Sequence, residues 1–207
     1  VGCRVMTPTF DLLARRQHGL VTRAQALPAI GRHGIAHRAK CGRFVHVARS
    51  VYRLEGSPRT WLQAARAATL AAPSGAVLSH RAAGRLWGLP HCKDAAVEVT
   101  VGTTRSHAIR AFRVHRSHVH PDMCTTAERV PVTSIERTIV DLAGVLGRWR
   151  LCDALDWAIQ RGLTTAERVW LALARMGSQG RRGVRGLRTL LSDRMRPVRG
   201  TESPLED

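Results

Sequence analysis

The feature that most constrains the fold is a change in the spacing of apolar residues at Gly42. Before it, apolar residues at helical spacing and helix-ending signals predict three short helices within residues 9–41. Thr22 and Gln25 have the spacing of a capping box at the start of the second helix. After Gly42, alternating apolar residues predict a β-hairpin over residues 44–54.

Helix, helix, helix and hairpin, in this order, are typical of a winged helix-turn-helix. Pro28 keeps the second helix short, so a third helix can run from about Arg32 to Cys41. In a winged helix the third helix enters the major groove of DNA and the hairpin lies on the backbone. Gly34, inside this third helix, costs about 1 kcal/mol of helix propensity relative to Ala. The sequence therefore does not fix the residue at which this helix begins.

The rest of the chain mixes short strands with helices and then becomes helical. Gly56-Ser57-Pro58 is a breaker, after which strands and helices alternate as far as residue 133. We therefore predict an α+β protein: a winged-helix domain at 9–56, a mixed α/β domain at 60–195 whose C-terminal part is helical, and a tail at 196–207. The five tryptophans fall on apolar helix faces and are interpreted as core residues.

Charge is the strongest indication of a partner. Lys and Arg number 33 against 15 Asp and Glu, which gives a net charge of +18, and all but Lys40 and Lys93 of these basic residues are arginines. Such a balance implies a polyanion, and nucleic acid is favoured because basic side chains release counterions from phosphate. The alternative, an anionic membrane surface, usually needs a polybasic run beside an amphipathic anchor, and none is recognisable.

Half of this net charge lies in residues 1–60, which contain the predicted winged helix. Residues 1–60 hold eleven Lys and Arg against two acidic residues. The side chains expected to contact double-stranded DNA cluster around the third helix and the hairpin: Arg23, Arg32, His33, His37, Arg38, Lys40, Arg43 and Arg49. A second arginine-rich segment, residues 181–199, fits a phosphate-contacting role and an exposed helix face equally well.

The sequence contains no recognisable catalytic or nucleotide-binding motif, so we expect a non-enzyme without catalytic residues or cofactor. Residue types that bind zinc occur close together at His115, His118, His120 and Cys124. Their spacing is not that of a helical zinc site, so no metal site is expected.

Two pairs of polar residues are given structural interpretations. Ser79 is interpreted as a helix N-cap, because a serine cannot use the adjacent His80 as its base in a helix start. Asp153 and Asp156 share a helix face, and a surface or arginine-paired role is expected for them.

The expected compartment is the cytoplasm. No stretch approaches the roughly 18 apolar residues of a membrane span, and residues 1–7 lack the apolar core of a signal peptide. The five cysteines are scattered without a C-x-x-C pair, which predicts reduced thiols.

A series of strings along nearly the whole chain resembles the AbiEi-like antitoxins of type IV, or abortive-infection, toxin–antitoxin systems. The strings are Gly19-Leu-Val-Thr-Arg-Ala-Gln25, Gly42-Arg-Phe-Val-His-Val47, Leu78-Ser-His-Arg-Ala-Ala83, Leu86-Trp-Gly-Leu89, Val97-Glu-Val-Thr-Val101, Val114-His-Arg-Ser117 and Val132-Thr-Ser-Ile-Glu-Arg-Thr-Ile-Val-Asp-Leu-Ala143. The resemblance implies a DNA-binding antitoxin that represses its own operon through the winged helix. It also implies antagonism of a nucleotidyltransferase-like toxin without a stable complex.

Many similar proteins continue into a nuclease domain like the very-short-patch-repair (Vsr) endonucleases of the PD-(D/E)XK superfamily. Thr201-Glu-Ser-Pro-Leu-Glu206 resembles the start of its first helix, where Glu202 would match the helix carboxylate. The Asp and Glu-x-Lys strands of that site do not occur before Asp207, so we expect no nuclease activity. A truncated Vsr-like endonuclease is the alternative function, and an RNA-binding module is a third.

Overall fold

The computed structural model of the 207-residue chain describes residues 8–102, 112–177 and 182–196. The chain forms two compact units, which divide between Ser134 and Ile135. The described residues contain eight α-helices and two β-sheets, which confirms the α+β class. Among them, no helix has both the length and the apolar character that crossing a bilayer requires.

The first five elements of the chain form its N-terminal part. They are α1 (Pro8–Arg16), β1 (Leu20–Thr22), α2 (Arg23–Lys40), β2 (Phe44–Ala48) and β3 (Val51–Leu54). The predicted capping box is confirmed at the start of α2: Thr22 Oγ1 accepts from the Gln25 amide at 3.2 Å, and Gln25 Oε1 accepts from the Thr22 amide at 2.9 Å.

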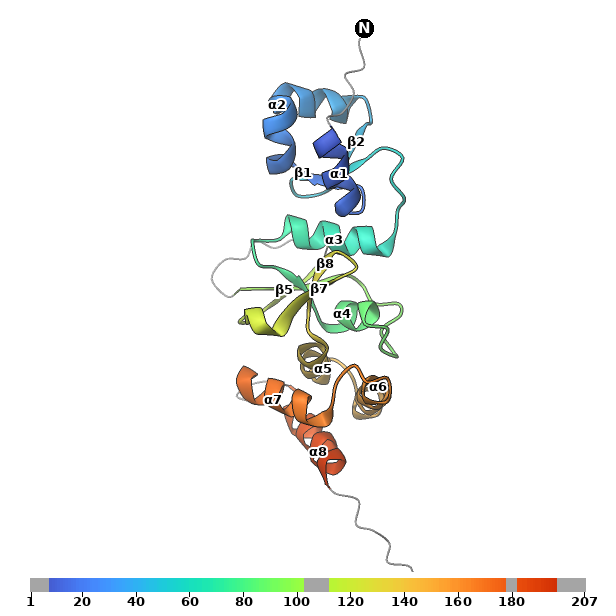
Figure 1. Ribbon diagram of the computed structural model, residues 1–207, viewed down its shortest axis with the longest axis vertical. Coiled ribbons are helices and arrows are strands. Elements are labelled where there is room, and N and C mark those ends of the chain that lie inside the picture. Colours follow the sequence, from blue (N-terminus) through green and yellow to red (C-terminus); the bar gives the residue numbers. More distant parts are fainter. Residues whose placement is uncertain (1–7, 103–111, 178–181, 197–207) are drawn as a thin grey trace, which may run out of the picture. The chain divides into compact units, whose positions relative to one another are not determined.

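Helix α2 consists of two helical arms that meet at Gly31. This glycine has φ 64° and ψ 175°, a conformation that an L side chain rarely adopts and that interrupts the helix. Pro28 lies just before the break and has no amide hydrogen to donate. Figure 1 shows the resulting bend, so the arms at 23–30 and 32–40 correspond to the predicted second and third helices.

The hairpin of β2 and β3 is confirmed, and it belongs to a three-stranded sheet of order β1-β3-β2. Leu20 and Val21, which the sequence analysis took for a connection, pair in β1 with Arg53 and Tyr52 of β3. The strand is only three residues long and its two apolar residues are both buried, so it shows no alternation and was missed.

The next elements build a five-stranded sheet of order β6-β5-β4-β8-β7. Their bounds are α3 (Trp61–Ala71), β4 (Val77–Leu78), α4 (His80–Leu86), β5 (Glu98–Val101), β6 (Arg113–Arg116), the 3₁₀ turn η1 (Pro121–Met123), β7 (Cys124–Ala127) and β8 (Val130–Thr133). Strands β5 and β6 are parallel, as are β4 and β8, whereas β4 pairs with β5 and β7 with β8 in antiparallel fashion.

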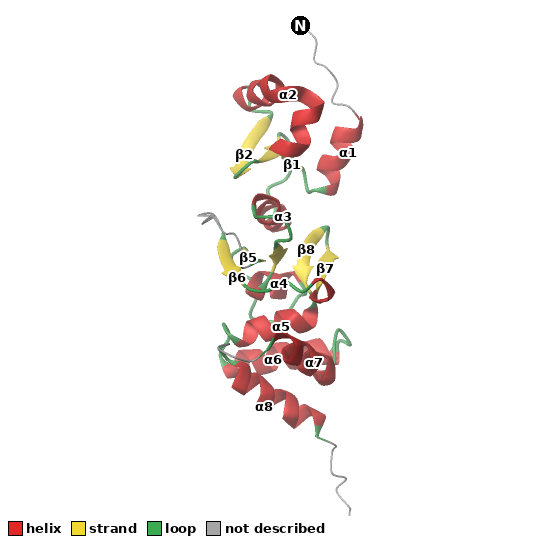
Figure 2. Cartoon of the chain, turned by 90° about the vertical axis from the view of Figure 1, so that its left-hand side faces the viewer, coloured by secondary structure: helices red, strands yellow, loops and turns green. Residues whose placement is uncertain are grey.

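Helix α3 lies between the two sheets, as Figures 1 and 2 both show. Ala67 packs with Leu20 and Val51 of the first sheet, and Ala65 packs with Leu78 and Val132 of the second. One helix thus contributes to both cores, which explains why residues up to 134 form a single compact unit.

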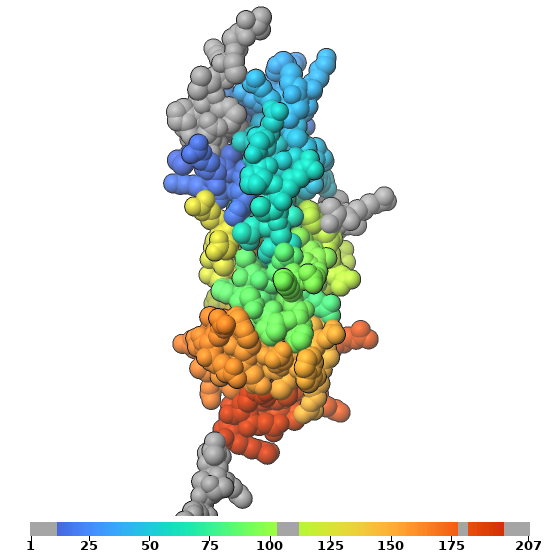
Figure 3. Space-filling model, turned by 90° about the vertical axis from the view of Figure 1, so that its right-hand side faces the viewer, coloured from blue at the N-terminus to red at the C-terminus, as the bar shows by residue number. Residues whose placement is uncertain are grey.

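The segment at 56–58, where the sequence suggested a domain boundary, is packed rather than free. Arg53 Nη1 donates to the Ser57 carbonyl at 3.0 Å, and a Cβ on Gly19 would lie 2.2 Å from Ser57 Oγ. In Figure 3 the turquoise residues of this segment lie directly against the blue N-terminal residues.

The second unit contains the helices α5 (Ile135–Ala143), α6 (Arg148–Gln160), α7 (Ala166–Met176) and α8 (Val184–Met195). Helix α5 packs against the other three and is buried along most of its length. Trp149 on α6 is 70% exposed, so its interpretation as a core residue was wrong. Trp157 and Trp170, in the same unit, are half-buried.

The arginine-paired interpretation is confirmed for Asp156. Arg194 on α8 donates from Nε to Asp156 Oδ1 at 2.5 Å and from Nη2 to Oδ2 at 2.7 Å. The hydrogen bond from Arg194 holds the pKa of the Asp156 carboxyl below its usual value.

Replacing Asp156 by Asn is expected to make the stability of the chain less sensitive to acid. A lowered carboxyl pKa contributes stability above the unfolded-state value of about 4, and this contribution is lost as the pH falls through the folded-state value. Urea unfolding at pH 7 and pH 3 should therefore show a wild-type advantage at pH 7 that shrinks at pH 3. Asp193→Asn, which removes an exposed carboxylate from α8, is the control and should show no such change.

Candidate nucleic-acid interface

The second arm of α2 presents one basic face. Arg32, His33, His37 and Lys40 are exposed, and their spacing places them on the same side of the helix. Ile35, on the opposite side, is buried in the core with Val21 and Phe44. This division of polar and apolar sides orients the four basic side chains outward.

Arg38, which was predicted to join this face, points elsewhere. It is half-buried, and its guanidinium lies 6.0 Å from the centroid of the Phe44 ring on β2. This distance is at the limit of a cation–π interaction. Arg38 therefore covers the core between α2 and the hairpin, and its truncation would remove packing as well as charge.

The hairpin and the start of α2 supply further exposed basic groups. Arg43 precedes β2, Arg49 lies in the turn between β2 and β3, and Arg23 is the first residue of α2. His46, in the middle of β2, is also exposed and stands edge-on to the Tyr52 ring at 5.8 Å. His46 was not among the predicted residues, although a polar residue between Val45 and Val47 is typical of the outer side of a strand.

A buried amide network fixes the N-terminal end of α2. Gln17 and Gln25 donate to each other's side-chain oxygens at 3.0 and 3.2 Å, and Gln17 also donates to the Leu20 carbonyl at 3.3 Å. From α3, Gln63 donates to the His18 carbonyl at 2.8 Å. The basic face is thus carried by a part of the molecule that is hydrogen-bonded to α3.

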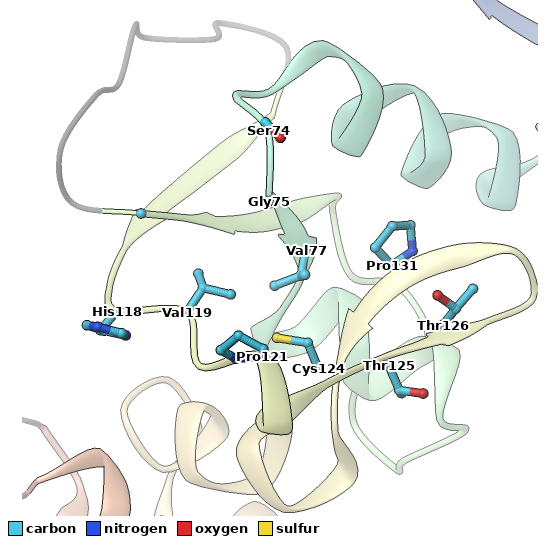
Figure 4. A pocket seen from close by; sticks show the side chains of 11 residues that line it. Ser74, Gly75, Val77, His118, Val119, Pro121, Cys124, Thr125, Thr126 and Pro131 are labelled. Carbon is cyan, nitrogen blue, oxygen red and sulfur yellow. The ribbon is translucent and has the colours of Figure 1, made fainter.

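The four residues with zinc-ligand chemistry in the sequence, His115, His118, His120 and Cys124, do not converge on one point. His118 and His120 stack at 4.3 Å between ring centroids, while the Cys124 thiol donates to the His120 carbonyl. Figure 4 shows His118 and Cys124 on different sides of a hollow of about 700 Å³, with Val119 and Pro121 between them. His115 instead contacts residues of β5 and α4, which are described below.

The Ser79 hydroxyl is hydrogen-bonded to neighbouring side chains, and the described cysteines are not paired with one another. Ser79 occupies the N-cap position of α4, as predicted, but its hydroxyl forms no capping hydrogen bond and accepts from Thr100 Oγ1 at 2.7 Å. His80 Nδ1 lies 3.0 Å from the same hydroxyl, so the premise that these adjacent side chains cannot pair was wrong. None of the four described cysteines forms a disulfide. Burial raises the pKa of the Cys92 thiol to about 11, which keeps it protonated at neutral pH.

The arginine-rich segment divides between two roles. Arg194 is engaged by Asp156, whereas Arg185 and Arg188 lie exposed on α8. Residues 181 and 197–199 lie outside the described part of the chain, and so does Glu202 with the string that resembles a nuclease start.

Three comparisons place the chain among known proteins by fold alone. No protein-family model matches the sequence. No curated protein matches it either. Among solved structures, the crystal structure of the RV2827C protein from Mycobacterium tuberculosis is similar, with a TM-score of 0.55 and 15% sequence identity over 91% of this chain and 76% of that one. The chain therefore shares the arrangement of its elements with that mycobacterial protein.

Proposed function

We propose that residues 8–54 form a winged helix that binds duplex DNA, and that the protein is a DNA-binding, antitoxin-like transcriptional regulator without catalytic activity. One observation carries the proposal. Arg32, His33, His37 and Lys40 share an exposed face of one helical arm, and the exposed Arg49 lies in the turn of the adjacent hairpin.

The topology supports this interpretation. Two helical arms joined at Gly31 precede a hairpin, and the short strand β1 closes the sheet beside β3. In helix-turn-helix proteins the N-terminal residues of the recognition helix reach base edges. Arg32 and His33 occupy that end of the arm and are the candidates for base contacts, while Arg49 and Arg43 suit phosphates beside the groove.

The proposal is tested with the double variant Arg32→Ala/Lys40→Ala. Removing two phosphate-contacting charges should weaken binding to a duplex from the chain's own promoter region at least tenfold. It should also reduce the slope of log K against log salt by about 2, since each contact contributes about 0.9. Fluorescence anisotropy over a salt series measures both quantities in full-length protein.

A matched control distinguishes the contribution of this basic face to DNA binding from that of the total charge. Arg148→Ala/Arg150→Ala removes the same charge from exposed positions on α6 and should leave the slope nearly unchanged. An equal loss in both double variants would contradict the proposed interface, because net charge alone would then explain the binding. Competition with duplex RNA tests the preference for DNA.

The regulatory part of the proposal rests on the resemblance to AbiEi-like antitoxins. It predicts that the protein acts in the cytoplasm and represses a reporter gene placed behind the chain's own promoter. The Arg32→Ala/Lys40→Ala variant should lose this repression. A nucleotidyltransferase-like toxin would be a functional partner, neutralised on co-expression without co-purifying. The absence of catalysis is tested by plasmid nicking with magnesium, where cleavage by the purified chain would refute it.

A further inference from the structure

A second group of chemically competent side chains lies away from the basic face. His80 begins α4, Glu98 begins β5, and His115 lies in β6. One potential ligand atom from each residue lies within 4.8 Å of the other two. In the described ranges 8–102, 112–177 and 182–196, this is the one set of three or more His, Cys, Asp or Glu side chains that converges in this way.

The second sheet brings these three residues together. In the parallel pair of β5 and β6, Thr100 is in register with His115, so Glu98 and Thr100 lie on the face that His115 also occupies. The Ser79 amide donates to the Glu98 carbonyl at 3.0 Å, which fixes the start of α4 beside β5. His80 follows with φ 52°, a left-handed conformation that is costly for a residue with a side chain.

The contacts within the group are short and polar. His115 Nε2 lies 2.6 Å from Glu98 Oε2, and the rings of His80 and His115 stack with centroids 3.5 Å apart. His80 Nδ1 lies 3.0 Å from Ser79 Oγ, which also accepts from Thr100 Oγ1. Glu98 is 3% exposed, whereas both histidines are half-buried and reach the surface.

We propose that His80, Glu98 and His115 bind one divalent transition-metal ion, of which zinc is the best match. Two imidazoles and one carboxylate form a known three-residue zinc ligand set that leaves the fourth position to water. A cation also compensates the cost of burying the Glu98 carboxylate.

The surroundings have the form of an outer ligand shell. His80 Nδ1 lies 3.0 Å from the Ser79 hydroxyl, and in the tautomer in which Nδ1 is the donor, Nε2 keeps its lone pair for a metal, as hydrogen bonds to metal-bound histidines require. Thr100 in turn holds the Ser79 hydroxyl. This role accounts for a buried serine hydroxyl at the start of α4 that does not cap the helix.

Binding requires a small rearrangement. With bonds of about 2.0–2.1 Å, tetrahedral ligand atoms lie about 3.3 Å apart. The Glu98–His115 contact of 2.6 Å must therefore lengthen, and the stacked rings of His80 and His115 must separate. Rotation of the two half-buried imidazoles supplies this change.

The test is titration of chelator-treated, full-length protein with zinc and, in parallel, with cobalt, whose visible absorption reports the coordination number. We expect one equivalent to bind with a four- or five-coordinate cobalt spectrum. The variants His80→Ala/His115→Ala and Glu98→Gln should each weaken zinc binding at least tenfold. Glu98→Gln keeps a hydrogen-bonding side chain of the same size, so it decides the question if the double variant fails to fold by circular dichroism.

The matched control is His118→Ala/His120→Ala, which removes the other stacked histidine pair of the same unit. It should bind zinc with an affinity within threefold of the wild-type value. Loss of binding in this control, unchanged binding in Glu98→Gln, or no stoichiometric binding to the wild-type chain would each overturn the proposal.

Discussion

Replacing Arg137 by Leu is expected to lower the free energy of unfolding by about 3–5 kcal/mol. Arg137 Nε donates to both carboxylate oxygens of Asp141, one turn later on α5, at 3.0 Å. The two side chains are 2% and 3% exposed. The Leu variant leaves the buried Asp141 carboxylate without the Arg137 guanidinium, and the loss of that cation is the main cost.

The cause can be isolated with a second variant. Arg137→Leu/Asp141→Leu removes both charges and should recover much of the lost stability, because apolar replacements of a buried pair are often neutral. Arg148→Leu, an exposed arginine on α6, should change the free energy of unfolding by no more than about 0.5 kcal/mol. Urea unfolding measures all three variants, and a double variant no more stable than Arg137→Leu would show that the charge is not the cause.

Local signals made the N-terminal part predictable. Thr22 and Gln25 are three residues apart, and the contacts that begin α2 lie within that distance. The alternation around Arg49 likewise indicates a hairpin, because its two strands are neighbours in sequence. The side on which Arg38 lies required the structure, since its partner Phe44 comes from the following strand, and so did the pairing of β1 with β3.

The group of His80, Glu98 and His115 was not predictable by the same means. Its members come from three elements and meet through the pairing of β5 with β6, which no local pattern encodes. Glu98 lies in an alternating run, Val97 to Val101, whose polar residues would normally face water. In the sheet all four residues of β5 are buried, because helices α3 and α4 pack against the strand while β4 and β6 pair with its edges. The burial of Glu98 depends on these helices and is not encoded in the run itself.

Two glycines of the second unit, three residues apart, are expected to respond to alanine with opposite signs. Gly183 precedes α8 with φ 77°, and a Cβ there would lie 1.7 Å from the Ala143 carbonyl oxygen at the end of α5. The neighbour is backbone and cannot rotate away. Combining this overlap with the left-handed conformation, we expect Gly183→Ala to cost about 2–5 kcal/mol.

Gly186 lies within α8, and apart from its chain neighbours and the backbone of its own helix, a Cβ there would meet no atom within 4 Å. Gly186→Ala should therefore stabilise the chain by up to about 1 kcal/mol through helix propensity alone. Urea unfolding of the two variants tests the close approach of Gly183 to α5. Both variants add one methyl group to the same short segment, so a difference in stability reports the surroundings of each glycine. If Gly183→Ala were as stable as the wild type, the start of α8 could not lie against the end of α5 as the structure places it.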